Sequence, residues 1–280
     1  MLTEAEQRVY LARIERALKL SAETARTLLR GSFRITDRGG RRVSTEVDRC
    51  LSNVLRATLP KPGEGWLSEE DHDDKQRLRC SVVWIVDPLD GTREFVDGIP
   101  EWCISLGLVV EGNAVAGGIC NPATNELFLG ALNCGVTYNG MPVRARRVSS
   151  LIGADVLASR QECDRGEWKC FESAQFTVRQ IGSVAYKLAL VAAGLADATW
   201  TLSPKSEWDV AGGVALVKSS GGHVGGIPNT DMKFNREVTL LSGLVACANG
   251  LWPEIARTID RAGTAVTMQH RLAPAARTSA

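Results

Sequence analysis

A short apolar run that ends in two acids constrains this chain more than any other feature. Residues 82–86, Val-Val-Trp-Ile-Val, are typical of a buried strand. The run stops at Asp87, and Asp90 follows three residues later. Two carboxylates at the mouth of a buried strand cost free energy unless a positive charge compensates them. Because no His or Cys lies nearby in this stretch, its carboxylate oxygens indicate a hard divalent ion such as Mg²⁺.

The residues that follow these acids suggest a phosphate ligand. Gly91 allows a close approach to the backbone, and Thr92 can open a helix whose free N–H groups bind phosphate. The stretch therefore predicts magnesium-dependent phosphate chemistry, although an ordinary Asp-Gly turn is an alternative interpretation. Two acidic motifs of similar composition do not fit the spacing. An EF-hand loop that starts at Asp87 has Gly98 at its twelfth position, where a Glu is needed. The D-x-D-G-T motif of haloacid-dehalogenase-type phosphatases separates its acids by two positions, whereas here the separation is three.

The composition is that of an ordinary globular protein. The chain has 280 residues, of which 44% are hydrophobic and 23% charged, and its net charge is +1. No overall field recruits a nucleic-acid polymer or a membrane. The eight cysteines show no C-x-x-C pair, which favours reduced thiols and a cytoplasmic location. The three histidines are scattered, which argues against a His-based metal site or a Ser-His-Asp triad. We find no apolar signal core and no run near the roughly 20 residues that span a bilayer.

The first half of the chain predicts two helices followed by strands. Thr3 caps an amphipathic helix that runs to about residue 30, and Thr45 caps a second helix that ends before Pro60. The polar stretches 34–42 and 61–76 are expected to be loops. Short strands separated by turns then indicate an antiparallel sheet, and they cover 102–110, 114–120, 126–131 and 136–138.

The pattern changes near residue 150 to alternating strands and helices, which indicates an α/β arrangement. The expected strands are 155–159, 176–180, 197–201, 223–226 and 240–246, and the expected helices are 165–174, 183–194, 208–220 and 253–262. We therefore predict an N-terminal α+β half, residues 1–150, and a C-terminal α/β half, residues 151–267. Residues 268–280 are expected to be a frayed tail. The chemistry is expected between the two halves.

The string D-P-L-D-G-T-R-E-F, residues 87–95, resembles the signature of the inositol monophosphatase superfamily. Further landmarks occur in the same order as in that family: Thr45 to Asp48, Glu69-Glu70, Gly182-Ser183, and Trp208-Asp209 before a helix of small residues. The resemblance covers about residues 5–265. It implies a layered α-β-α-β-α sandwich of the inositol monophosphatase and fructose-1,6-bisphosphatase type.

The resemblance also implies a set of site residues. Two or three Mg²⁺ ions would be held by the side chains of Glu69, Asp87, Asp90 and Asp209 and by the carbonyl of Leu89. Thr92 and Asp48 would orient and deprotonate the attacking water, with Glu69 as a third catalytic residue, and the attack would be direct and in line. The expected substrate contacts are Asp90, Gly91, Thr92, Ser183, Lys205, Glu207 and Asp209.

The substrate is harder to predict. Inositol monophosphatases have an acid seven positions before the Trp-Asp aspartate, whereas this chain has Leu202 there. The strings D-G-T-R-E-F and L-S-P-K-S-E-W-D look more like the 3′(2′),5′-bisphosphate nucleotidases of the CysQ type, which dephosphorylate 3′-phosphoadenosine 5′-phosphate to AMP. Lys205 would then meet the second phosphate, unless it is only a solvated lysine. Inositol 1-phosphate is the second choice, with Glu207 as the polyol contact, and fructose 1,6-bisphosphate or another sugar phosphate is the third.

Other properties follow only from the resemblance. It implies a homodimer, inhibition by Li⁺, and a mobile lid formed by residues 31–43. An interpretation from another class is a catalytically idle metal-binding protein that acts through partners. Such a protein would usually have lost Thr92 or one of the carboxylates, and this sequence has the full set.

Overall fold

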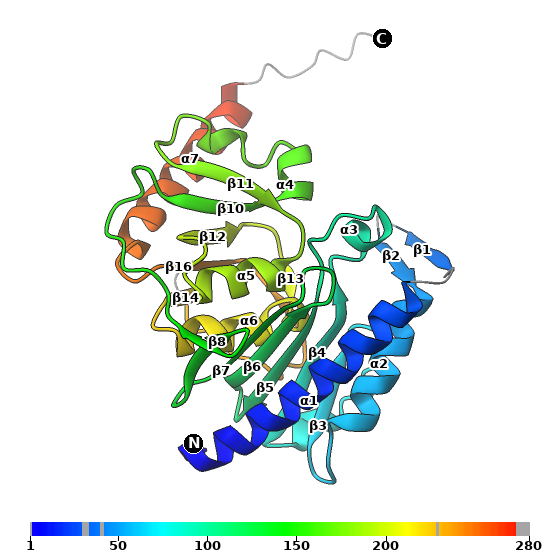
Figure 1. Cartoon of the computed structure of the whole chain (residues 1–280). Helices are drawn as coiled ribbons and strands as arrows, with labels where there is room; N and C mark the ends of the chain where they lie inside the picture. The colour runs from blue at the N-terminus through cyan, green and yellow to red at the C-terminus, as the bar shows by residue number, and fades with distance from the viewer. Residues whose placement is uncertain (1, 30–33, 40–41, 228–229, 273–280) are drawn as a thin grey trace.

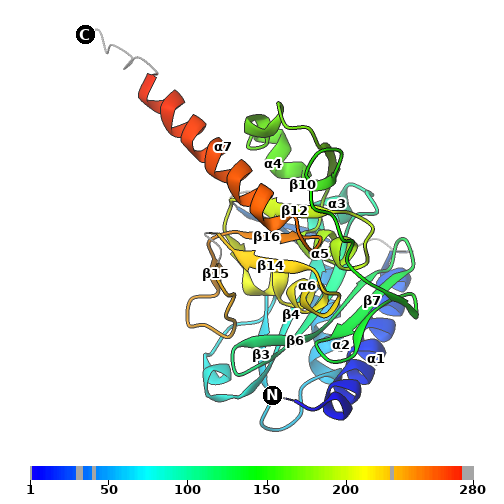
Figure 2. The ribbon, with the colours of Figure 1, turned by 90° about the vertical axis from the view of Figure 1, so that its left-hand side faces the viewer.

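Two β-sheets alternate with three layers of helices in this protein (Figures 1 and 2). The computed structural model describes residues 2–29, 34–39, 42–227 and 230–272. In Figure 1 the layers run from α7 at the left, through the two sheets with α5 and α6 between them, to α1 and α2 at the right. The structure therefore confirms the predicted α/β class and the layered α-β-α-β-α sandwich.

The first helical layer and the first sheet come from the N-terminal part of the chain. The layer consists of α1 (Glu4–Leu28) and α2 (Glu46–Thr58). The sheet has the order β3-β4-β5-β6-β7-β8-β9, in which only the β3–β4 pair is parallel. Its strands are β3 (Gly65–Ser68), β4 (Val82–Asp90), β5 (Cys103–Val110), β6 (Asn113–Asn121), β7 (Glu126–Ala131), β8 (Gly135–Tyr138) and β9 (Met141–Val143).

The middle helices and the second sheet come from the C-terminal part. The middle layer consists of α5 (Val184–Ala192) and α6 (Glu207–Ser219). The second sheet has the order β11 (Thr177–Ile181), β10 (Asp155–Ser159), β12 (Ala198–Thr201), β16 (Leu244–Cys247) and β14 (His223–Gly226). Helix α7 (Trp252–Leu272) covers its outer face, and Figure 2 shows this helix running away from the body of the molecule.

Short elements complete the fold. They are β1 (Ile35–Gly39) and β2 (Arg42–Thr45), which form a hairpin, the 3₁₀ turns Gln76–Arg79 and Lys169–Phe171, the helices α3 (Thr92–Val96) and α4 (Arg160–Asp164), and the paired strands β13 (Lys205–Ser206) and β15 (Leu240–Leu241).

The central strands of both sheets are buried on both faces, which explains their continuous apolar runs. Along β4, Val83 and Ile85 pack with the middle helices, whereas Trp84 and Val86 pack with α1 and α2. The side chains of β16 alternate in the same way between the middle layer and α7. The middle core includes residues from both halves, so the proposed boundary near residue 150 crosses a continuous core and stays a prediction.

Helix α6 approaches the first sheet most closely at glycines, where the backbone of one element contacts the other. A Cβ atom added to Gly117 of β6 would overlap the carbonyl oxygen of Gly212, and one added to Gly107 of β5 would lie 2.8 Å from the Cβ of Ala211. These glycines set the distance between the start of α6 and the end of β4, which both contribute to the site described below.

Several sequence predictions are confirmed. Thr3 and Glu6 form a capping box at α1, and Thr45 and Asp48 form one at α2. The strands and helices expected after residue 80 are present, apart from the differences that follow. All eight cysteine thiols are free. As a separate observation, none of the helices in the described ranges has the length and apolar character to cross a membrane.

Other predictions were wrong. Residues 34–42 were expected to be a loop, but β1 and β2 pair there, and β3 lies within the second expected loop. The helix expected at 165–174 is replaced by α4 and a 3₁₀ turn. The strand expected at 240–246 is split because Gly243 has a φ of +125°. The second sheet is mixed, since β16 pairs antiparallel with β12 and β14. Helix α7 extends to Leu272, and the rest of the expected tail lies outside the described residues.

Candidate active site

A cavity of about 250 Å³ opens at the end of β4. It is lined by Glu69, Asp87, Leu89, Asp90, Gly91, Thr92, Arg93, Glu94, Ser159, Gln161, Gly182, Ser183, Val184, Lys205 and Asp209. These residues come from both sheets and from the middle helices. The structure thus brings together the carboxylates that the sequence scatters over 140 positions, from 69 to 209.

Asp87 and Asp90 lie in the last four residues of β4. Asp87 is 1% exposed, and its Oδ1 accepts the N–H of Leu89 at 3.0 Å. Asp90 accepts two hydrogen bonds at the start of α5, from the hydroxyl of Ser183 at 2.5 Å and from the N–H of Ala185 at 2.6 Å. Burial raises the pKa of both carboxyl groups, and that of Asp87 is raised further by the charge of Glu69.

Glu69 and Asp209 approach the same place from other elements. Because β3 runs parallel to β4 with Ser68 opposite Val86, Glu69 emerges beside Asp87. Asp209 is the third residue of α6, and its Oδ2 accepts the N–H of Ser206 at 2.8 Å. Glu69 is reached by solvent through the cavity, yet its pKa is raised by the surrounding protein and then by the charges of Asp209, Glu70, Asp90 and Asp48. Negative charge is therefore concentrated here.

Gly91, Thr92 and Asp48 form the next part of the wall. Gly91 has a φ of +92°, and a Cβ atom there would lie 3.0 Å from the carbonyl oxygen of Glu101, so this turn requires glycine. Thr92 begins α3, and its hydroxyl lies 3.2 Å from Oδ1 of Asp48 and 3.0 Å from the carbonyl oxygen of Leu89. The other carboxylate oxygen of Asp48 accepts both the N–H and the hydroxyl of Thr45.

Three expected substrate contacts lie in different settings. Ser183 is the N-cap of α5 and lines the cavity. Lys205 also lines it, and its side chain is only 16% exposed, so it is not a solvated lysine. Glu207 is different. It is 0% exposed, does not line the cavity, and accepts the N–H groups of Asn235 and Arg236 at 2.7 and 3.0 Å. The prediction of Glu207 as a substrate contact was wrong, because its carboxylate anchors the segment before β15.

Two buried charges near the cavity were not predicted from the sequence. Lys187 of α5 is 3% exposed and donates to the carbonyl oxygens of Ile181, Gly182 and Ser183 at 2.9 to 3.2 Å, which fixes that wall. Burial lowers the pKa of its ammonium to about 8. Glu162 of α4 is 1% exposed and pairs with Lys205. A charged residue inside an apolar helix was the only sequence signal for Lys187, and Glu162 gave none.

The donor set fits Mg²⁺ in its chemistry. Neither Asp87 nor Glu69 forms an ion pair with a Lys or Arg side chain among the described residues, so their negative charge is uncompensated within the protein. All available ligand atoms are carboxylate or carbonyl oxygens, which suit a hard cation. In the described ranges, no three or more His, Cys, Asp or Glu side chains form a group that could hold a metal ion in their present positions.

Comparison with solved structures shows the same fold in known phosphatases. The inositol monophosphatase from Anabaena has a TM-score of 0.74 at 24% identity, over 91% of this chain and 96% of its own. The inositol monophosphatase from Zymomonas mobilis has a TM-score of 0.74 at 21% identity, over 92% and 100%.

Two of the three sequence relatives described next are named as phosphatases. An inositol-1-monophosphatase of Mesorhizobium japonicum is 35% identical over 64% of this chain and 70% of its own. A fructose-1,6-bisphosphatase/inositol-1-monophosphatase of Thermotoga maritima is 30% identical over 74% and 80%. The Nus factor SuhB of Xylella fastidiosa is 30% identical over 74% and 79%.

The fold and these relatives define a phosphoric monoester hydrolase. The model of the inositol monophosphatase family matches residues 8–264, which is nearly the whole chain. The chain belongs to the inositol monophosphatase family. This confirms the family resemblance seen in the sequence.

Proposed function

We propose that this protein is a Mg²⁺-dependent phosphatase that hydrolyses a small phosphomonoester by direct in-line attack of water. The observation that carries the proposal is the meeting of Glu69, Asp87, Asp90 and Asp209 in one cavity beside the hydrogen-bonded pair Thr92–Asp48. Carboxylates that the protein leaves uncompensated give a cation its site, and the pair beside them can handle a proton.

Four side chains and one backbone oxygen would hold the metal ions: the carboxylates of Glu69, Asp87, Asp90 and Asp209 and the carbonyl of Leu89. When bound, two or three Mg²⁺ ions would lower the pKa of water and neutralise charge on the phosphate and the departing oxygen. The hydrogen bonds from Ser183 and Ala185 fix the orientation of Asp90, and Ser206 does the same for Asp209.

Thr92 and Asp48 would orient and deprotonate the attacking water. The Thr92 hydroxyl accepts a proton from water as it donates its own to Asp48, which lies within hydrogen-bonding distance. The second oxygen of Asp48 is held by Thr45, so the carboxylate cannot turn away. The N–H groups of Gly91 and Thr92, at the turn into α3, would bind phosphate oxygens.

As substrate we propose a 3′(2′),5′-bisphosphate nucleotide such as 3′-phosphoadenosine 5′-phosphate, which would give AMP and phosphate. A polyol needs a polar partner, but Leu202 is apolar and half-exposed, and the carboxylate of Glu207 is buried and used elsewhere. Lys205, in contrast, offers a positive charge at the cavity to a second phosphate. Cytoplasmic location, dimerisation and inhibition by Li⁺ belong to the same proposal.

Inositol 1-phosphate is the second candidate, because the relatives of Mesorhizobium and Thermotoga both have inositol-1-monophosphatase in their names. The Thermotoga name also includes fructose 1,6-bisphosphate hydrolysis, which makes that ester the third. The interpretation as an idle metal-binding protein is disfavoured, since the Thr92–Asp48 pair is assembled.

The test is phosphate release with and without Mg²⁺ from 3′-phosphoadenosine 5′-phosphate, inositol 1-phosphate and fructose 1,6-bisphosphate. We expect activity only with the metal, and a preference for the nucleotide of about 100-fold in kcat/KM, equivalent to about 2.7 kcal/mol. A preference for inositol 1-phosphate would overturn the substrate proposal, and no turnover of any ester would overturn the enzyme proposal.

A further inference from the structure

We propose that Glu162 is a positioning residue that holds the ammonium group of Lys205 at the wall of the active-site cavity, so that this charge meets the substrate in a fixed place. The inference rests on the proposed function, since it assumes that Lys205 faces a phosphorylated substrate. It adds a residue that lies outside the cavity and has no counterpart among the predicted site residues.

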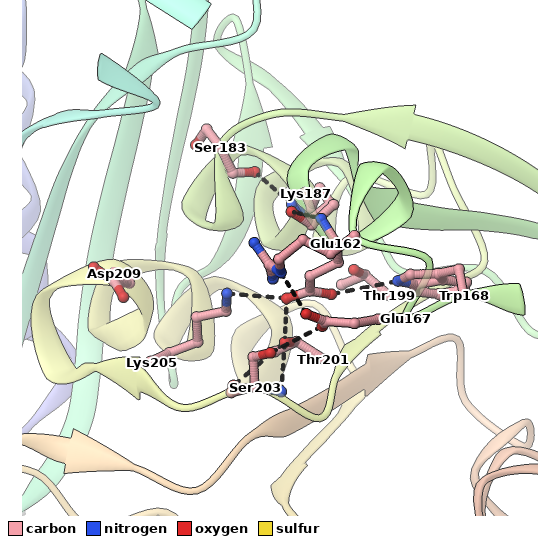
Figure 3. A network of polar contacts seen from close by, with 12 residues as sticks. Glu162, Glu167, Trp168, Ser183, Lys187, Thr199, Thr201, Ser203, Lys205 and Asp209 are labelled. Carbon is pink, nitrogen blue, oxygen red and sulfur yellow. Dashed lines mark hydrogen bonds and ion pairs between the residues drawn. The ribbon is translucent and has the colours of Figure 1, made fainter. Parts of the chain in front are cut away.

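The contacts of Glu162 form a closed network (Figure 3). Its Oε1 accepts hydrogen bonds from the ammonium of Lys205 at 3.0 Å and from the hydroxyl of Thr201 at 2.5 Å, and its Oε2 accepts the indole N–H of Trp168 at 3.3 Å. The side chain of Glu162 is 2% exposed. Its orientation is thus fixed by two neutral donors in addition to Lys205.

Lys205 is shared between this network and the cavity. It lines the cavity, and Glu162 is the only hydrogen-bond partner of its ammonium among the described residues. An ammonium group has three N–H donors, so two remain for a ligand. Its charge already reaches the carboxylate cluster, because it lowers the pKa of Asp90 against the effect of burial. A positive group held here would face an anionic substrate.

Stability alone gives a weak reason for this ion pair. Removing two charges from water costs about as much as their attraction returns, and apolar replacements of buried pairs are often neutral or stabilising. What the pair does provide is a lysine with a defined position, in β13, immediately before the helix that carries Asp209.

The first experiment measures kcat and KM for the Glu162→Gln, Lys205→Met and double variants with 3′-phosphoadenosine 5′-phosphate and inositol 1-phosphate. We expect each single change to raise KM for the nucleotide about tenfold with little change in kcat, as for a loss of uniform substrate binding. The double variant should resemble Lys205→Met within about twofold, because Glu162 acts through the lysine.

Glu167→Gln is the matched control. Glu167 is a neighbouring carboxylate that pairs with Arg165 and accepts a hydrogen bond from Ser203, and among the described residues it forms no hydrogen bond or ion pair with Lys205. We expect its kinetics to stay at the wild-type level. If the Glu162→Gln effect is fully retained on top of Lys205→Met, or if KM does not change, the proposal is overturned.

A second readout does not depend on catalysis. Lys205 is labelled with an amine-reactive ester, and the rate is followed by mass spectrometry of its peptide. Loss of the carboxylate frees the ammonium from its ion pair, so Glu162→Gln should label about tenfold faster than wild type, while Glu167→Gln should not. Equal labelling rates would overturn the positioning role. If wild type hydrolyses no ester, the proposed function fails, and the labelling rates still decide whether Glu162 holds Lys205.

Should Glu162→Gln fold poorly, Thr201→Val removes one of the donors that orient Glu162 without placing a new polar group. Thr201→Val should raise both the KM for the nucleotide and the labelling rate of Lys205 by about threefold. Wild-type KM and labelling in a folded Thr201→Val variant, together with wild-type KM for Lys205→Met, would overturn the proposal.

Discussion

Two glutamates stand at the opposite ends of β3, and the protein treats them differently. Glu64, before the strand, accepts hydrogen bonds from the two terminal nitrogens of the Arg13 guanidinium at 2.6 and 2.7 Å and from the indole N–H of Trp84 at 2.8 Å. Burial would raise its pKa, but the hydrogen bonds and the charge of Arg13 lower it to about 2. Glu69, after the strand, has no such cation among the described residues, and the surrounding protein and the charges of neighbouring acids raise its pKa to about 8.

The contrast shows that this sheet can place an arginine beside a partly buried glutamate, as it does at Glu64. The same sheet pairs one glutamate with an arginine and leaves the other among carboxylates. A charge that the protein leaves uncompensated in a cavity is available to a ligand, which is why such groups mark functional sites. The following predictions test whether Glu64 serves stability and Glu69 serves the site.

The largest effect is expected for Glu69→Gln. Loss of a metal carboxylate should lower kcat/KM by about 1,000-fold or more, equivalent to at least ~4 kcal/mol of transition-state stabilisation. The measurement is phosphate release at saturating Mg²⁺. Glu64→Gln is the control and should retain nearly full activity while folded. Comparable losses of kcat/KM in Glu69→Gln and Glu64→Gln would show that the two glutamates do not differ in their importance for activity.

The next effect is on folding. Glu64→Gln leaves the buried guanidinium of Arg13 without its carboxylate, and we expect the free energy of unfolding to fall by about 2 to 3 kcal/mol. Urea denaturation in the presence of EDTA measures this. Under the same conditions Glu69→Gln should be as stable as wild type or slightly more stable, because it removes repulsion. A destabilised Glu69→Gln would show that this carboxylate has a structural partner.

Magnesium should stabilise the wild-type protein by mass action. At a concentration one hundred times its Kd, Mg²⁺ adds about 2.7 kcal/mol to the free energy of unfolding. Thermal denaturation with and without the ion should show a rise in Tm for wild type and for Glu64→Gln. The rise should be small or absent for Glu69→Gln. An equal rise in all three proteins would place the ion elsewhere.

The smallest effect is the part of the pH dependence of stability that Glu64→Gln removes. Its pKa in the folded state lies below its unfolded value, so its contribution to stability is complete above about pH 4.5 and is lost as the pH falls toward 2. The difference in unfolding free energy between wild type and Glu64→Gln should therefore narrow over that range. A difference that stays constant down to pH 3 would show that packing, not charge, explains it.

The parts of the fold that were predicted from sequence depend on local patterns. The apolar run 82–86 identified β4, and Thr45 followed three residues later by Asp48 identified the start of α2. The hairpin at residues 35–45 was missed because its strands are short and polar, and its pairing is not visible in hydrophobic periodicity.

The site was predicted where the family resemblance supplied a motif. Asp87, Asp90 and Thr92 line one cavity, and Asp48 lies within hydrogen-bonding distance of Thr92, while the roles that the motif implies for them stay predictions. Glu207 was misjudged, because its role depends on backbone N–H groups 28 and 29 residues away. The partner of Lys205 lies 43 residues before it, and nothing in either local sequence indicates the pairing. Long-range side-chain contacts are what the sequence patterns do not carry.

The direct contact of α6 with the first sheet has a consequence for the tuning of this site. The spacing between Asp209 and the acids of β4 is set by three missing side chains, at Gly107, Gly117 and Gly212. A methyl group added at Gly117 would push α6 away from the sheet. Asp209 would then move relative to Asp87 and Asp90, although none of these carboxylates would be chemically changed. The fit of the proposed metal ions would thus depend on glycines that provide none of the proposed ligands.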